Sequence, residues 1–178
     1  MQEKLHDFIS ADDIKNIVRR LGKQLSLDYA SLLKPEEPLK VIIILKGAIL
    51  FASDLIREIT VPIRLDMIRL ASYGSSTRSS GEIRMLKDLE ESPKDSHVLI
   101  LDEIVDTGRT LAVLIQKLRT AGAKSVRTCT LLNKASRREV SINVDYVGQE
   151  IEDRFVVGYG LDFNEAYRNL PAIYYIKT

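Results

Sequence analysis

The residues best suited to chemistry lie in one segment, residues 98–111, where an apolar run is followed by three acids, a glycine and two threonines. In open α/β sheets, ligands bind beyond the carboxyl ends of the strands, and the turn into the next helix offers free backbone N–H groups to a phosphate. Gly108 permits close approach of the backbone to an anion, and the flanking hydroxyls can donate further hydrogen bonds. The segment predicts a phosphate-binding turn, made of Asp106, Thr107, Gly108, Arg109 and Thr110.

Two further acids, Asp102 and Glu103, follow the apolar run directly. Carboxylate oxygens at a strand end can bind Mg²⁺ or the hydroxyl groups of a sugar. The alternative is that Asp106 only caps the following helix while the other two acids are solvated. Three carboxylates crowded against an apolar strand repel one another unless a cation or a polyhydroxy ligand intervenes, so capping alone explains the cluster poorly.

Strand and helix patterns alternate along the chain and supply the elements that must position this segment. Ser10 and Asp13 resemble a capping box ahead of apolar residues at helical spacing. The patterns predict helices from Ser10 to the KPEEP segment at 34–38, over 48–59 and over about 110–119, and strands at 41–45, 61–67, 83–86, 97–101, 125–132, 144–147, 155–157 and 173–176. This alternation predicts an α/β domain with a mostly parallel sheet.

The composition describes one soluble domain over residues 1–178. Its 26 Lys and Arg residues against 25 Asp and Glu residues give a net charge of +1, which argues against binding nucleic acid or a membrane surface by charge alone. No apolar run approaches the roughly 18 residues of a membrane span, and the first ten residues lack a secretory signal. The single Cys129 permits no internal disulfide, so we expect a cytoplasmic protein.

Residues 72–81 are Ser, Thr or Gly at eight of ten positions, which leaves too little apolar area to hold the segment against a core. We expect a mobile loop here. Such a loop can act as a lid that closes over a reacting centre, but its composition is equally typical of an ordinary disordered connection.

Residues 98–111 resemble the phosphoribosyl-pyrophosphate signature of the type I phosphoribosyltransferases, which is an apolar strand, two acids, two apolar residues and then Asp-Thr-Gly-x-Thr. Four other segments, in the same order along the chain, resemble the hypoxanthine-guanine phosphoribosyltransferases: Leu45-Lys46-Gly47, Ser72-Tyr73-Gly74, Leu131-Leu132-Asn133-Lys134, and residues 155–162 followed by Arg168. The likeness runs from about Ile42 to Leu170. One departure is that the family usually has Glu then Asp where this chain has Asp102 then Glu103, which keeps both charges but changes their reach.

The resemblance implies a purine-salvage enzyme. Its reaction moves the 5-phosphoribosyl group of phosphoribosyl pyrophosphate onto N9 of hypoxanthine or guanine, and gives IMP or GMP plus pyrophosphate. The implied fold is a mostly parallel sheet flanked by helices, with a small hood built from the chain termini. The resemblance also implies Mg²⁺ as cofactor and a homodimer or homotetramer.

Roles for individual residues follow from the same resemblance. Asp102, Glu103 and Asp162 would hold Mg²⁺ and the ribose, and Lys46, the Gly47 backbone and Arg168 would bind pyrophosphate. Ser72 would start the lid and Tyr73 would seal it. The purine would lie against Lys134, Phe155, Val156 and Asp162, with Lys134 donating to O6, Phe155 stacking on the base and the Val156 backbone contacting its edge.

Asp106 has the implied catalytic role, because it would lie beside N7 of the purine and take that proton as N9 becomes nucleophilic. A donor aimed at O6 also favours 6-oxopurines over adenine, since a mismatched buried charge is costly. Regulatory relatives of the fold can carry an apolar residue in place of this acid, and this chain keeps Asp106.

Three alternatives remain to be weighed. One is an enzyme that prefers xanthine, which differs only in the contacts at C2 of the purine. Another is a nucleotide-sensing regulator without turnover; the presence of Asp106 and the absence of a basic stripe count against it. A dinucleotide-binding domain is excluded because no G-x-G-x-x-G motif opens a helix in this chain.

Overall fold

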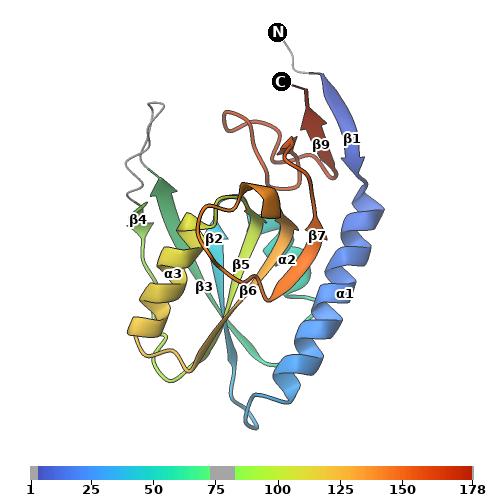
Figure 1. Ribbon diagram of the computed structural model, residues 1–178. Helices are drawn as coiled ribbons and strands as arrows, with labels where there is room; N and C mark the ends of the chain where they lie inside the picture. The colour runs from blue at the N-terminus through green and yellow to red at the C-terminus, as the bar shows by residue number, and fades with distance from the viewer. Residues whose placement is uncertain (1–3, 73–82, 178) are drawn as a thin grey trace.

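The computed structural model describes residues 4–72 and 83–177 of the chain. Its centre is a six-stranded sheet in the order β4-β3-β2-β5-β6-β7, and among these strands only β4 is antiparallel to its neighbour (Figure 1). The strands are β2 (Leu39–Leu45), β3 (Ile63–Ser72), β4 (Ile83–Lys87), β5 (His97–Val105), β6 (Ser125–Asn133) and β7 (Tyr146–Glu150). The mostly parallel α/β sheet predicted from the sequence is confirmed.

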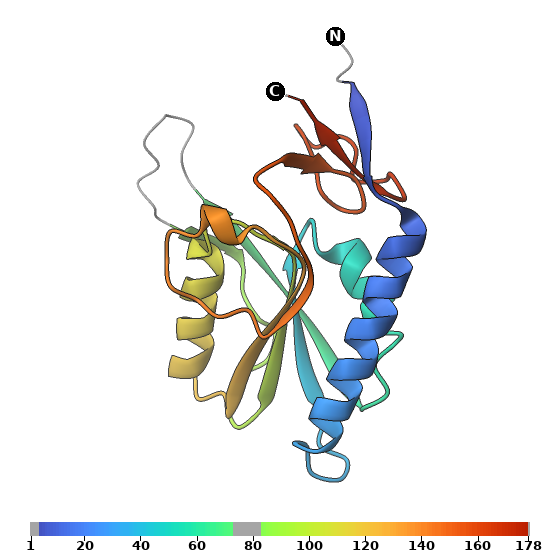
Figure 2. The same cartoon turned by 45° about the vertical axis from the view of Figure 1, so that its right-hand side comes forward.

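Helices cover both faces of this sheet, which explains the unbroken apolar runs of its central strands. α1 (Ala11–Ala30) and α2 (Ile49–Leu55) lie on one face, and α3 (Arg109–Thr120) lies on the other (Figure 2). Alternate residues of β2 enter two separate cores: Val41 and Ile43 pack with the first two helices, whereas Ile42 and Ile44 pack with α3. Residues 41–44 therefore present apolar side chains to both faces of the sheet.

The start of α1 agrees with the capping pattern of the sequence. The Ser10 hydroxyl oxygen accepts a hydrogen bond from the backbone N–H of Asp13 at 3.1 Å, and the same hydroxyl donates to the Asp13 carboxylate at 2.6 Å. The helix ends at Ala30, shortly before the proline-containing segment at 34–38.

A second, smaller sheet lies beyond the carboxyl ends of the parallel strands, next to both chain ends (Figures 1 and 2). It contains β1 (Leu5–Ile9), β9 (Ile173–Ile176) and β8 (Phe155–Val157) in the order β1-β9-β8, and both pairings are antiparallel. This is the expected hood built from the chain termini. It brings residues 155–168 over the end of the main sheet where the sequence predicts the ligand.

Several predicted boundaries differ from the structure. The helix predicted over 48–59 is shorter, because α2 ends at Leu55 and the next three residues form a turn. The strand predicted from residue 61 begins at Ile63, which forms the first pair of the parallel ladder, with Leu39. β1 was not predicted, and a short 3-10 helix (Ala135–Arg137) follows β6.

Two further expectations concern the loop and the membrane. β3 ends at Ser72, but Tyr73 and most of the predicted lid at 72–81 lie outside the described residues. Among the helices of the described chain, none is both long and apolar enough to cross a bilayer.

Candidate active site

The predicted phosphate turn connects the end of β5 to the start of α3. Gly108 is the residue before the helix and has a left-handed φ of 81°, and a side chain there would bring a Cβ within 2.8 Å of Ile142 Cδ1. The segment after the 3-10 helix holds the turn in place, because the Thr107 carbonyl accepts the backbone N–H of Glu139 at 3.1 Å. Gly108 has no side chain that could cap the helix, and the backbone N–H of Arg109 donates to the Thr107 hydroxyl at 3.4 Å.

A cavity of about 260 Å³ lies over this turn. Four of the five turn residues line it, whereas the guanidinium of Arg109 instead pairs with Glu139 at 2.7 Å. The remaining lining residues are the two acids of β5, apolar residues of β2, β3 and β5, and the first apolar residue of α3: Asp102, Glu103, Ile44, Leu45, Leu70, Ile104, Val105 and Leu111. The cavity thus joins the predicted phosphate turn to a pair of carboxylates.

Asp102 and Glu103 lack an ion pair with any described residue. Burial raises the pKa of the Asp102 carboxyl well above its usual range, and the neighbouring Glu103 raises it further. Burial also raises the pKa of Glu103. A bound cation would relieve both effects, because it favours the ionised carboxylates. The donor set therefore fits Mg²⁺, which prefers carboxylate oxygens and water.

The loop between β2 and α2 contains Lys46 and Gly47, and its Leu45–Lys46 peptide bond is cis. Gly47 lies directly against Glu103, since a Cβ added to Gly47 would be 1.8 Å from Glu103 Oε1. Gly160 packs on the same loop, because its own Cβ would lie 2.0 Å from the Gly47 carbonyl oxygen. These contacts join the predicted pyrophosphate loop to the carboxylate pair and to residues 158–168, the segment below the hood that follows β8.

Arg168 approaches this loop from the other side of the site. Its guanidinium donates to the Gly160 carbonyl at 2.7 Å and pairs with Asp162 Oδ1 at 2.8 Å. Lys46 Nζ and Arg168 Nη2 both contact Glu165 Oε2, at 2.8 Å and 3.4 Å. The two predicted pyrophosphate ligands are therefore brought together by a third residue.

Asp106 and Lys134 are connected in a similar way. Arg137 Nε lies 3.2 Å from Asp106 Oδ1, and Arg137 Nη1 lies 3.2 Å from Asp153 Oδ2. The buried Lys134 ammonium lies 3.7 Å from the other oxygen of Asp153. The predicted proton acceptor and the predicted purine donor thus belong to one chain of alternating charges.

Phe155 has the exposure expected of a residue that stacks on a ligand. Its side chain is 42% exposed, and its one aromatic neighbour in the described chain is Phe163, which meets it edge to face with centroids 5.4 Å apart. The adjacent Val156 is buried and pairs with Tyr175 of β9. The Phe155 side chain is therefore partly open to solvent, while the hood holds its backbone.

Comparison with known proteins agrees with this geometry. Residues 10–164 match the phosphoribosyl transferase domain family. The hypoxanthine-guanine phosphoribosyltransferases of Bacillus subtilis and Staphylococcus aureus are 44% and 42% identical to this chain over 95% of its length, and the matches cover 91% and 92% of those proteins. This chain belongs to the hypoxanthine-guanine phosphoribosyltransferase family.

Solved structures of the family have the same fold. Hypoxanthine phosphoribosyltransferase from Staphylococcus aureus matches with a TM-score of 0.89 at 41% identity, covering 97% of this chain and 91% of that one. The enzyme from Trypanosoma cruzi matches with a TM-score of 0.92 at 35% identity, covering 99% and 93%. The bifunctional protein TilS/HprT of Listeria innocua is 43% identical over 95% of this chain, which spans only 25% of that longer protein.

The three acids predicted to hold Mg²⁺ do not form a single cluster. In the described part of the chain, no group of three or more Asp, Glu, His or Cys side chains is close enough to hold a metal. Asp162 is instead engaged with Arg168 and accepts the backbone N–H of Glu165 at 2.9 Å. The metal role of Asp102, Glu103 and Asp162 together stays a prediction.

Three residues of this phosphoribosyltransferase site were missed in the sequence: Arg137, Asp153 and Glu165. Each lies in a loop or at a loop end and contacts a predicted site residue far away along the chain. The acids and Arg168 around residue 165 follow at intervals of three residues, which was the one available signal. The partners across the site could not be read from that spacing.

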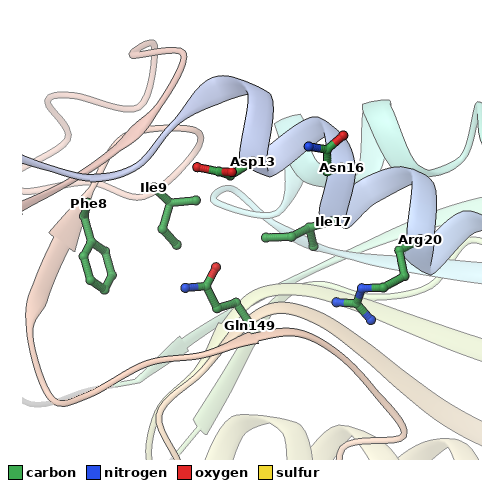
Figure 3. A pocket seen from close by; sticks show the side chains of 7 residues that line it. All are labelled: Phe8, Ile9, Asp13, Asn16, Ile17, Arg20 and Gln149. Atoms are coloured by element: carbon green, nitrogen blue, oxygen red, sulfur yellow. The ribbon is translucent and has the colours of Figure 1, made fainter.

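A larger cavity, of about 450 Å³, lies on the opposite side of α1 from α2, between α1 and β7 (Figure 3). It is lined by Phe8, Ile9, Asp13, Asn16, Ile17, Arg20 and Gln149, none of which is a predicted site residue. Arg20 from this set donates to the Val147 carbonyl of the edge strand β7 at 3.2 Å. This contact ties α1 to the edge of the sheet, and we assign the cavity no part in the reaction.

Proposed function

We propose that this chain transfers the 5-phosphoribosyl group of phosphoribosyl pyrophosphate to N9 of hypoxanthine or guanine, and so forms IMP or GMP and pyrophosphate. One observation carries the proposal: a single cavity is lined by the glycine-containing turn at the start of α3 and by the unpaired carboxylates Asp102 and Glu103. Names of relatives at 42–44% identity support the same reaction. The expected cytoplasmic location and the dimeric or tetrameric assembly stay predictions.

The physical difficulty of this reaction is charge. The anomeric carbon becomes cationic while a polyanionic leaving group departs, so the site must bind the phosphates and keep water away. The backbone N–H groups of the turn, together with the hydroxyls of Thr107 and Thr110, bind the 5-phosphate at the positive end of α3. Lys46, from the loop that contains Gly47, and Arg168, from the segment below the hood, bind the pyrophosphate between them.

The carboxylates of Asp102 and Glu103 hold Mg²⁺, with Asp162 on the far side of Arg168 as the third candidate. When bound, the metal neutralises charge on the pyrophosphate. Because Glu103 lies against Gly47, the Glu103 carboxylate is next to the loop that binds the pyrophosphate. The same carboxylates are positioned to hydrogen-bond to the ribose hydroxyls.

Asp106 is the residue that accepts the N7 proton as N9 attacks. Arg137 orients its carboxylate through the 3.2 Å contact, and the same guanidinium leads through Asp153 to Lys134. Lys134 donates to O6 of the purine, and the half-open ring of Phe155 stacks on the base. Adenine would place an amino group against the Lys134 ammonium, so two donors would face each other and binding would be poor.

The experiment that tests this function is product formation from phosphoribosyl pyrophosphate and Mg²⁺ with hypoxanthine, guanine, xanthine, adenine and uracil in parallel. We expect turnover of hypoxanthine and guanine but not of adenine or uracil. Asp106→Asn should lower kcat by about 10²- to 10⁴-fold, the range typical of a lost proton acceptor. The matched control is Asp88→Asn, which removes an exposed acid paired with Lys117 at 2.6 Å outside the site and should leave kcat unchanged.

The other outcomes distinguish the alternatives. Preferred turnover of xanthine would replace the stated base specificity but keep the transfer reaction. Binding of phosphoribosyl pyrophosphate or a nucleotide with no product from any base would contradict catalysis and favour a sensor.

A further inference from the structure

Glu165 occupies the space between the two cations assigned to pyrophosphate. A single oxygen, Glu165 Oε2, lies 2.8 Å from Lys46 Nζ and 3.4 Å from Arg168 Nη2. Lys46 comes from the loop after β2, whereas Arg168 comes from the segment below the hood, so this oxygen joins two parts of the chain more than a hundred residues apart. A phosphate oxygen shared between the same two cations would need that position.

The backbone around Glu165 is built to hold this carboxylate in place. Glu165 and the preceding Asn164 both adopt left-handed conformations, with φ of 63° and 50°. Non-glycine residues seldom adopt this region, and they keep it only when the surroundings impose it. Here the backbone N–H of Glu165 donates to Asp162 Oδ2 at 2.9 Å, and Phe163 and Ala166 bridge across the turn.

The ion pair between Glu165 and Lys46 is open to water, so another anion can replace the carboxylate. The Lys46 ammonium and the Arg168 guanidinium both lie against the Glu165 carboxylate, at 2.8 Å and 3.4 Å. The Lys46 and Glu165 side chains are 46% and 64% exposed, and ion pairs this open to water are weak. Arg168 is more buried and keeps its contacts to Asp162 and Gly160 without Glu165.

We propose that Glu165 is an internal competitor of pyrophosphate. Its carboxylate holds Lys46 and Arg168 in position, and leaves when the pyrophosphate group of the substrate binds between them. As the product departs, the carboxylate returns and lowers the affinity for pyrophosphate, which favours release. This inference rests on the proposed function, because it assigns both cations to pyrophosphate.

The test is the dissociation constant of pyrophosphate, measured by calorimetry in the presence of Mg²⁺, for the wild type and three variants. Glu165→Gln removes the competing charge and should tighten pyrophosphate binding about two- to fivefold, the range expected for an exposed ion pair. Glu165→Asp keeps the charge on a side chain one methylene shorter, and should tighten binding by a smaller factor. The matched control Glu90→Gln removes an exposed acid that pairs with Lys87 at 3.0 Å, and should leave the dissociation constant unchanged.

Kinetics provide a second readout that loss of folding would not imitate. Glu165→Gln should lower KM for phosphoribosyl pyrophosphate and leave KM for hypoxanthine unchanged. Weaker pyrophosphate binding in Glu165→Gln would overturn the proposal, because Glu165 would then assist the ligand. A Glu165→Asp variant that binds pyrophosphate more tightly than Glu165→Gln would also overturn it, since the variant that keeps the charge would then compete less than the one that lacks it.

Failure of this inference can be separated from failure of the proposed function. If the wild type makes IMP but Glu165→Gln and Glu90→Gln bind pyrophosphate equally well, only the role of Glu165 is wrong. If the wild type neither binds pyrophosphate with Mg²⁺ nor makes a nucleotide, the proposed function fails and this inference fails with it.

Discussion

Charged side chains gather at both ends of the central sheet, and their partners differ. Toward the amino ends of β2 and β3, Lys40 and Asp66 are 6% and 4% exposed. Asp66 accepts backbone N–H groups from Met67 at 2.8 Å and Glu90 at 3.0 Å, and the Lys40 ammonium donates to the Glu91 carbonyl at 2.9 Å. These two charges therefore find their hydrogen-bond partners within the protein.

At the carboxyl ends of the strands the charges have fewer partners, since Asp102 accepts one backbone N–H, from Glu103 at 3.1 Å. Asp102 and Glu103 have raised pKa values and no ion pair among the described residues. Lys134 is about as buried as Lys40 and lies 3.7 Å from the Asp153 carboxylate, but unlike Lys40 it donates no hydrogen bond from its ammonium to a described residue. Buried charges that are satisfied internally hold a fold together, whereas perturbed and unpaired ones in a cavity indicate a ligand site.

The largest expected effect comes from removing both charges at the carboxyl end. Asp102→Asn with Glu103→Gln should lower kcat/KM by about 10³-fold or more, because the metal and ribose contacts supply several kcal/mol to the transition state. Stability should not fall: a raised carboxyl pKa means that ionisation destabilises the folded state as pH rises, so the neutral variant avoids that cost at pH 7. Steady-state kinetics measure the loss of kcat/KM, and thermal unfolding without Mg²⁺ measures the stability. A lowered unfolding midpoint would show that these acids also support the fold.

The same type of substitution at the other end should have the opposite result. Asp66→Asn removes the buried counter-charge of Lys40 and leaves it only the exposed Glu91 carboxylate at 3.6 Å, so it should lower the free energy of unfolding by about 3 kcal/mol. The kcat/KM of the folded fraction should stay within about twofold of wild type, a difference of under about 0.5 kcal/mol. Urea unfolding and kinetics on the same preparation measure the two quantities. Full stability of Asp66→Asn, or a loss of activity in its folded fraction, would contradict the stated difference between the two ends of the sheet.

The smallest effect concerns an exposed pair. The hydrogen bond from Lys117 lowers the pKa of Asp88, so the folded pKa is below the unfolded one. The stability that this pair contributes is therefore present above the unfolded pKa and is lost as pH falls through the folded value. We expect Asp88→Asn to lower the unfolding midpoint at pH 7 by less than about 4 °C, and to match wild type at low pH. An equal difference at every pH would mean that charge is not the cause.

Much of the fold could be predicted from local pattern. β2 and α3 were close to their predicted bounds, because an unbroken β-branched run and a helical period with Gly122 behind it are each encoded within a dozen residues. β1 was missed, because Leu5–Ile9 pairs with residues 173–176 and no local signal announces a partner so far away. α2 was predicted too long, since its apolar residues continue beyond Leu55 into a turn.

The candidate site also contains a part that local sequence predicts and a part that it does not. The phosphate turn was predictable because strand, glycine turn and helix follow one another directly in the sequence around Gly108. The bridging roles of Arg137, Asp153 and Glu165 were not, because each depends on two loops meeting under the hood. Residues that act through contacts between distant loops leave little trace in spacing.

The most direct test of the contrast between the two ends is the thermal shift caused by Mg²⁺ with phosphoribosyl pyrophosphate. The ligands at about 100 times their dissociation constant should raise the unfolding midpoint by about 5–10 °C in the wild type and in Asp66→Asn, although the latter starts lower. Asp102→Asn with Glu103→Gln should show little or no shift. A full shift in that double variant, or its loss in Asp66→Asn, would contradict the assignment of the ligand to the carboxyl end of the sheet.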